Sequence, residues 1–130
     1  MGFLDGMNFD DVTEPKAVVA GEYELRVVEV TQDTNKNGDP YILPRFAIVG
    51  ESDSKSVTKY LALPFEGMDE EKLMKARRGL KRFFEAVGAD VSSGIDLESL
   101  HGETVWAMLG VEEDEEYGEG NFIRRFVAGK

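Results

Sequence analysis

The order of the secondary-structure elements constrains this chain more than any other feature of its sequence. Runs with the two-residue alternation of β-strands occupy Gly21–Pro64, and an amphipathic helix follows over Asp69–Val87. A last pair of strands is expected within Glu103–Gly129, around an acidic turn that contains glycine. Three strands, a helix and two strands leave few architectures open, because each element must bury its apolar face against another.

This order is that of the OB-fold, a small and partly open Greek-key barrel. The expected strands are Gly21–Asp33, Tyr41–Val49, Ser56–Leu63, Thr104–Val111 and Asn121–Val127. We therefore predict a mainly β protein, a five-stranded OB-fold barrel with one α-helix between strands 3 and 4. Residues 21–130 form this domain, and residues 1–20 form an N-terminal lead-in arm that is either docked on the barrel or partly disordered.

The helix is the most clearly marked element. Asp69 has the residue type of an N-cap, and Gly88 stands where a helix end favours glycine. Its apolar face is formed by Leu73, Ala76, Leu80, Phe83, Phe84 and Val87. The opposite face carries Lys75, Arg78 and Arg82. Such a basic stripe is more typical of a solvated helix face than of a phosphate track.

Three local signals refine the strands. Asn37-Gly38 predicts a hairpin turn, because this pair accepts the backbone angles that such turns need. Pro44 lacks the N–H that a sheet ladder uses, so the second strand is expected to be an edge or to carry a bulge there. Val28 and Val30 reverse the alternation of the first strand, which indicates a strand bent between the two halves of a barrel.

The net charge of −11 argues against nucleic acid at first sight, but its distribution is uneven. Residues 1–35 and 91–130 each carry a net charge of −6, residues 36–64 carry +1, and residues 65–90 are neutral. A local basic groove in the middle of the chain is therefore compatible with this composition. Steering of the whole molecule toward phosphate is not implied.

No catalytic constellation is visible, and we predict no catalytic residue, no metal site and no cofactor. Cysteine is absent, and His101 has no second ligand at metal-binding spacing. Asp33–Asp39 resembles the start of a calcium loop, but Pro44 stands where the bidentate acid is required. The chain contains no apolar run long enough to span a membrane. We therefore expect a cytoplasmic protein that is not an enzyme.

The pattern with chemical content combines aromatic and basic residues on predicted strands. Single-stranded nucleic acid needs this combination, since cations follow the phosphates and flat rings stack on unpaired bases. The candidate residues are Lys36, Tyr41, Arg45, Lys59, Tyr60, Phe122, Arg124 and Arg125. The alternative is that the phenylalanines are core residues and the arginines are ordinary surface charge. The sequence does not decide whether Phe122 and Phe126 or Ile123 and Val127 face inward, so both arginines remain candidates.

The acidic run Glu112–Glu116 is expected in the loop that joins strands 4 and 5. This loop is a frequent contact loop of the OB-fold, and five acids argue against a phosphate-binding role for it. A solvated hairpin tip is the first interpretation. A site that repels nucleic acid or docks a basic partner is the second.

The chain resembles a family of small phage early proteins thought to bind single-stranded DNA through an OB-fold. The matching residues are Asn8–Val12, Gly21–Tyr23, Asn35–Asp39, Leu63-Pro64, Phe83–Gly88, Asp96-Leu97 and Leu100–Val105. The resemblance implies a single-stranded DNA-binding protein of phage-type replication or recombination, with replication or recombination proteins as further partners, acting in the host cell cytoplasm. The alternative function is that of an acidic OB-like protein–protein interaction module.

Overall fold

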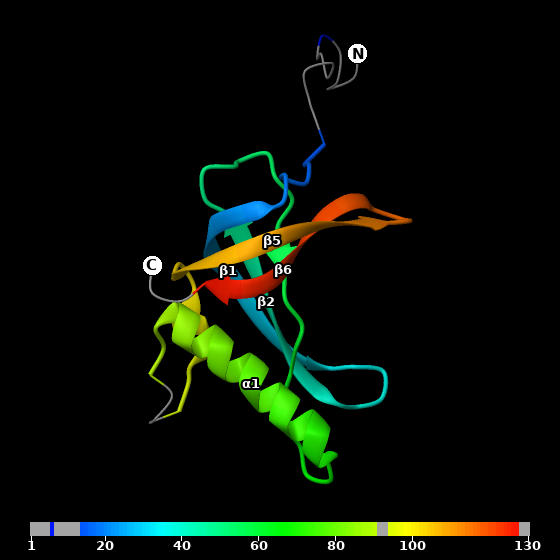
Figure 1. Cartoon of the computed structure of the whole chain (residues 1–130), viewed down its shortest axis with the longest axis vertical. Helices are drawn as coiled ribbons and strands as arrows, with labels where there is room; N and C mark the ends of the chain where they lie inside the picture. The colour runs from blue at the N-terminus through cyan, green and yellow to red at the C-terminus, as the bar shows by residue number, and fades with distance from the viewer. Residues whose placement is uncertain (1–5, 7–13, 91–93, 128–130) are drawn as a thin grey trace.

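The computed structural model shows a mainly β protein with one α-helix, and it describes residues 6, 14–90 and 94–127. The elements are β1 (Gly21–Thr34), β2 (Pro40–Ile48), β3 (Val57–Thr58), β4 (Leu61–Ala62), α1 (Glu70–Val87), η1 (Leu97–Leu100), β5 (Thr104–Asp114) and β6 (Gly118–Val127). The strands form one antiparallel sheet, and α1 lies along one side of it (Figure 1). The predicted mainly β class and the position of the helix are confirmed.

The sheet is bent but not closed. Its hydrogen-bonded order is β3-β2-β1-β5-β6, with β4 paired to β2 beside β3. The edge strands β3 and β6 lie against each other, yet no ladder joins them among the described strands. We call this open boundary the seam. The sheet has six strands and is open at the seam, so the five-stranded OB-fold barrel expected from the sequence is not confirmed in this detail.

Pro44 explains the sixth strand. The predicted strand Ser56–Leu63 is divided into β3 and β4, and the gap falls at Lys59 and Tyr60. The Pro44 carbonyl accepts a hydrogen bond of 3.1 Å from the Lys59 N–H, so the backbone of Pro44 faces this gap. A strand residue normally exchanges two bonds with its partner, and proline has no N–H for the second one. The ladder breaks there, and β2 continues as a central strand rather than an edge.

Two irregularities in register decide which side chains reach the core. In β1 the register shifts between Val27 and Glu29, so Val28 is an extra residue and Val30 packs against the same core as Val27. In β6, Arg125 is opposite Met108 and Ile123 is opposite Leu109, which leaves Arg124 as the extra residue.

The bulge in β6 resolves the choice that the sequence left open. Ile123 and Phe126 both face inward although they are three residues apart, because the extra residue interrupts the two-residue alternation. Each inward residue therefore comes from a different one of the two expected pairs.

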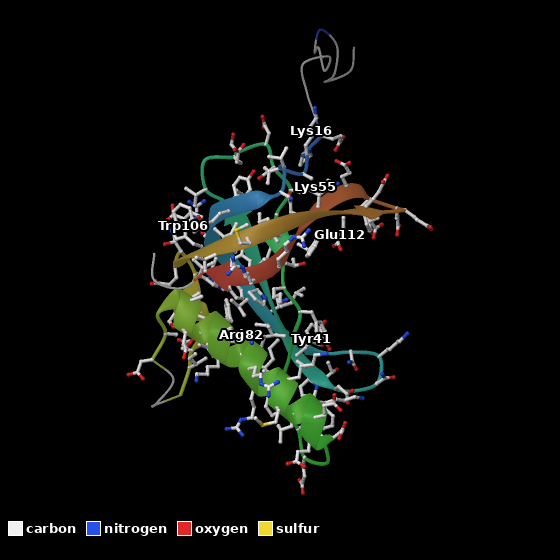
Figure 2. The ribbon with its side chains drawn as sticks, in the orientation of Figure 1. Lys16, Tyr41, Lys55, Arg82, Trp106 and Glu112 are labelled. Carbon is white, nitrogen blue, oxygen red and sulfur yellow. The ribbon has the colours of Figure 1, made fainter. Side chains whose placement is uncertain are left out.

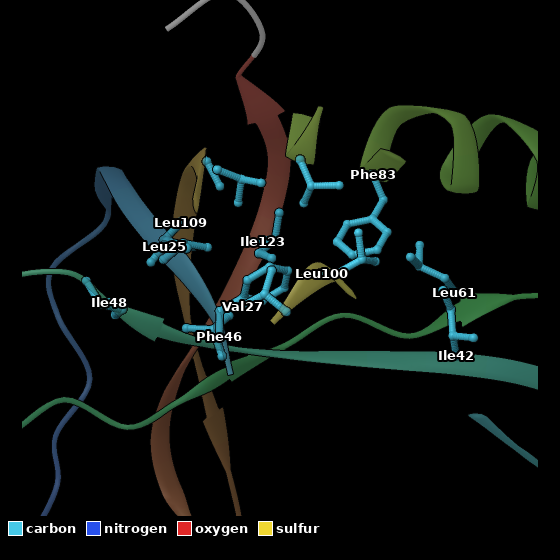
Figure 3. Packing of buried hydrophobic residues seen from close by; sticks show 14 residues of the cluster. Leu25, Val27, Ile42, Phe46, Ile48, Leu61, Phe83, Leu100, Leu109 and Ile123 are labelled. Atoms are coloured by element: carbon cyan, nitrogen blue, oxygen red, sulfur yellow. The ribbon is translucent and has the colours of Figure 1, made fainter. Parts of the chain in front are cut away.

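Helix α1 covers the core with its apolar face. Asp69 precedes it, and Gly88 ends it with a left-handed φ of 72°, as the sequence predicts. The Phe83 side chain is fully buried and meets Phe46 and Phe126 at ring-centroid distances of 6.2 and 5.9 Å. Leucines, valines and isoleucines of β1, β2, β5 and β6 complete the cluster (Figure 3). These contacts anchor the helix to the sheet.

The segment before β1 is fixed to the sheet over its described part. Lys16 forms an isolated parallel bridge with Ser54, and the Asn121 side chain bonds both the N–H and the carbonyl of Val18 at 2.9 Å. Residues 14–20 are therefore docked. Residues 1–5 and 7–13 of the predicted arm lie outside the described residues.

The acidic run is not a loop throughout. Glu112–Asp114 belongs to β5 and pairs with residues 118–120 of β6, because the hairpin is longer than its apolar pattern indicated. The hairpin projects from the side of the molecule away from α1 (Figure 1). The Lys55 ammonium donates to the carbonyls of Tyr117 and Glu119, each at 2.6 Å, and so holds the base of the hairpin turn.

No helix within the described ranges combines the length and the apolar character that crossing a bilayer requires.

Candidate functional site

A groove runs between α1 and the strands that α1 faces. Its first part is a hollow of about 650 Å³ between the helix, β4 and the turn that joins β1 to β2. Its second part is a hollow of about 470 Å³ between the helix and β6 at the seam. Both hollows are lined by Lys59, Leu61, Gly79 and Arg82, so they adjoin each other. We call the two hollows together the α1 groove.

The α1 groove is strongly basic although the protein is acidic. Seven cationic residues line it: Lys59, Lys72, Lys75, Arg78, Arg82, Arg124 and Arg125. Asp39 is the acidic residue among the lining residues of the two hollows. Ion pairs among the described residues join Arg45 to Glu29 and Lys81 to Glu85, and neither of them involves a groove cation. The positive charge of the groove is therefore available to a ligand.

A pair of stacked tyrosines stands at one end of the groove. The rings of Tyr41 and Tyr60 have centroids 4.6 Å apart and planes inclined by 27°. Tyr60 lines the groove and is 48% exposed, because it lies in the gap that Pro44 opens between β3 and β4. Tyr41 covers one face of the Tyr60 ring, so the exposed surface belongs to the rest of that ring. A flat aromatic surface is thereby presented beside the cations.

Asn35 fixes the Tyr60 ring from the turn. Its side-chain oxygen accepts from the N–H groups of Asn37 and Asp39 at 2.9 and 3.0 Å, which organises the turn. Its amide nitrogen donates to the Tyr60 hydroxyl at 3.2 Å. Gly38 has the positive φ of 82° that the predicted hairpin requires. The turn thus positions the aromatic end of the groove.

The structure separates two predicted residues from the groove. Arg45 lies on the outward face of β2, forms an ion pair of 3.4 Å with Glu29, and lines a different hollow together with Arg26 and Val28. Lys36 is an exposed residue of the turn and does not line the α1 groove. The expectation that Tyr41, Arg45, Lys59 and Tyr60 share one concave face therefore holds for Lys59 and Tyr60 but not for Arg45. Tyr41 lines neither hollow and contacts the groove only through its stack with Tyr60.

The β6 residues divide between the groove and its support. Arg124 and Arg125 both line the groove at the seam. Phe122 is half-buried, and the Arg124 guanidinium lies over its ring at 5.3 Å from the centroid. A Cβ atom at Gly110 would lie 2.5 Å from the Phe122 ring, so glycine is needed for this close approach. Phe122 therefore supports Arg124 rather than offering a free stacking surface in the groove.

The helix contributes more to the groove than the sequence indicated. Lys75, Arg78 and Arg82 are exposed, as the predicted solvated stripe requires, and together with Lys72 they also line one wall of the groove. One signal was available. Residues 72–84 contain six bases and no acid, so this part of the helix has few acids in its own sequence to pair with its cations.

No model of a known protein family matches this chain, and no curated protein is significantly similar to it. The function is therefore argued from the α1 groove and the fold that positions it.

Proposed function

We propose that this protein is a single-stranded DNA-binding protein built on an OB-type fold. It binds with little sequence preference, carries out no covalent chemistry, and acts in phage-type DNA replication or recombination. The strand order supports the fold assignment, because β3 and β6 face each other across a partly open boundary and α1 follows the third-strand segment.

The observation that carries the proposal is one groove with an exposed, stacked tyrosine and seven cations that form no ion pair with any residue the structure describes. Cations along a groove follow a phosphate backbone, and an exposed ring accepts any unpaired base. Bases in a duplex are already stacked on their neighbours and cannot occupy the Tyr60 ring without unpairing. The groove therefore favours single strands over duplexes.

The second candidate is an acidic protein–protein interaction module. The observation that favours it is the projecting β5–β6 hairpin, whose exposed carboxylates include Glu112 to Glu116. The two functions use different surfaces. In the leading proposal, replication or recombination proteins are further partners of the DNA-bound chain.

The proposal predicts salt-dependent binding to single strands. Fluorescence anisotropy would measure the affinity for labelled single strands of about 20 nucleotides, longer than the ~4–16 that an OB-fold covers. Four to seven phosphate contacts at about 0.7 each should weaken binding by about 50–1,000-fold between roughly 50 and 200 mM salt. Strands of different base composition should bind similarly.

The matched duplex is the control for this titration. It should bind more weakly than the single strand at both salt concentrations. Equal affinities for the two ligands, or no binding to either of them at low salt, would contradict the proposal. The second outcome would leave the acidic interaction module as the better description.

A further inference from the structure

We infer that α1 forms one wall of the binding site and that the phosphodiester backbone of a single strand runs along the α1 groove and passes Gly79. The inference deepens the proposed function and rests on it. It assigns binding roles to Arg78 and Arg82, and it gives the strand a path along the helix instead of across the outer face of β2.

The path follows from the way the two hollows adjoin. Tyr60 lines the hollow at one end, and Arg124 and Arg125 line the hollow at the other end. Gly79 and Arg82 line both hollows, so a ligand that extends from the tyrosine end to the seam must pass beside this part of α1.

The cations of α1 are of two kinds. Arg78 and Arg82 line the groove and form no ion pair among the described residues. Arg77 and Lys81 lie on the same helix but line neither hollow, and Lys81 pairs with Glu85 at 3.9 Å. The helix therefore provides a matched internal comparison, with equal charges at neighbouring positions inside and outside the groove.

The stability of α1 does not explain why glycine occupies position 79. Glycine inside a helix is less stable than alanine, and Gly79 does not have the positive φ that requires glycine. A Cβ atom there would meet the Leu61 side chain at 3.5 Å, an ordinary contact. What the missing side chain provides is open space where the two hollows meet.

The first test compares two double variants of equal charge. Arg78→Gln with Arg82→Gln should weaken single-strand binding by about 5–20-fold and make the salt slope shallower by about 1.4, since two phosphate contacts are lost. Arg77→Gln with Lys81→Gln should stay within about 2-fold of the parent. Equal losses in the two variants would overturn the inference, because they would show a general charge effect.

The second test adds a side chain at Gly79, where the two hollows meet. Gly79→Gln adds a neutral side chain and should weaken binding by roughly 10-fold, because the added atoms obstruct the path. Gly79→Ala should bind nearly as the parent does and raise the Tm by about 2–4 °C. Circular dichroism would show that Gly79→Gln remains folded, with a Tm no lower than that of the parent.

Different results would contradict the proposed function and the path along α1. If the parent protein binds no single-stranded DNA, the proposed function fails and the inference fails with it. If the parent binds and Gly79→Gln binds equally well, the inference alone is overturned, and the strand lies outside the α1 groove.

Discussion

Phe83→Ala is expected to lower the free energy of unfolding by about 3–5 kcal/mol, the range for large aromatic residues truncated in a core. The Phe83 side chain is fully buried, and its ring contacts Phe46, Phe84 and Phe126. Removal of the ring would leave a cavity between the helix and both halves of the sheet. Urea unfolding followed by circular dichroism would measure the loss.

Met74→Ala is the matched control on the same helix. Met74 is 42% exposed, so its truncation should change the unfolding free energy by less than about 0.5 kcal/mol. A loss below about 1 kcal/mol for Phe83→Ala would mean that α1 does not cover the core as the structure shows. The arrangement of the groove would then be wrong as well, because α1 forms one of its walls.

Tyr60→Ala is expected to weaken single-stranded DNA binding by about 1–3 kcal/mol, the usual contribution of one base stacked on an aromatic ring. The ring is exposed, and Tyr41 and Asn35 hold it in place, so a base that stacks there meets a preorganised surface. Fluorescence anisotropy with the labelled single strand would measure the change. The fold should persist, because Tyr60 lies outside the core.

Two variants separate stacking from other effects at this position. Tyr60→Phe keeps the ring and loses only the hydroxyl contact with Asn35, so it should retain most of the affinity. Arg45→Ala removes a nearby cation that already pairs with Glu29 and lies outside the groove, so it should leave both affinity and salt slope nearly unchanged. If Tyr60→Ala binds like the parent, no base stacks on this ring.

The helix and the strands at both ends of the chain could be predicted because their signals are local. The apolar spacing of α1 and the glycine that ends it need no information from elsewhere in the fold. The division of the third strand could be only partly foreseen. Pro44 indicated a break in the hydrogen-bonded ladder of the second strand. Which neighbouring strand would be interrupted depended on the direction in which the Pro44 carbonyl points.

The groove was harder to predict because it is made by packing. Tyr60 and Lys59 were selected from their residue types, yet their neighbours in the groove come from a helix that follows them in the chain. The periodicity of a helix shows which residues are opposite its core face. It does not show that the cations beside the core face lie along a strand, because that depends on how the helix packs across the sheet.

The β5–β6 hairpin, whose turn is held by the two hydrogen bonds of Lys55, and the α1 groove give the molecule an asymmetric charge distribution. Six exposed carboxylates lie along that hairpin, at Glu112–Glu116 and Glu119, while the groove cations lie beside α1. Glu112 lies on this hairpin, apart from Arg82 on α1 (Figure 2). At low ionic strength the net negative charge repels an approaching polyanion, but the asymmetric charge distribution orients the protein with its groove toward the polyanion. At physiological ionic strength, where screening acts over about 8 Å, the remote carboxylates lose their influence sooner than the cations in contact with the ligand do. A protein of net charge −11 can in this way meet a polyanion with its positive side.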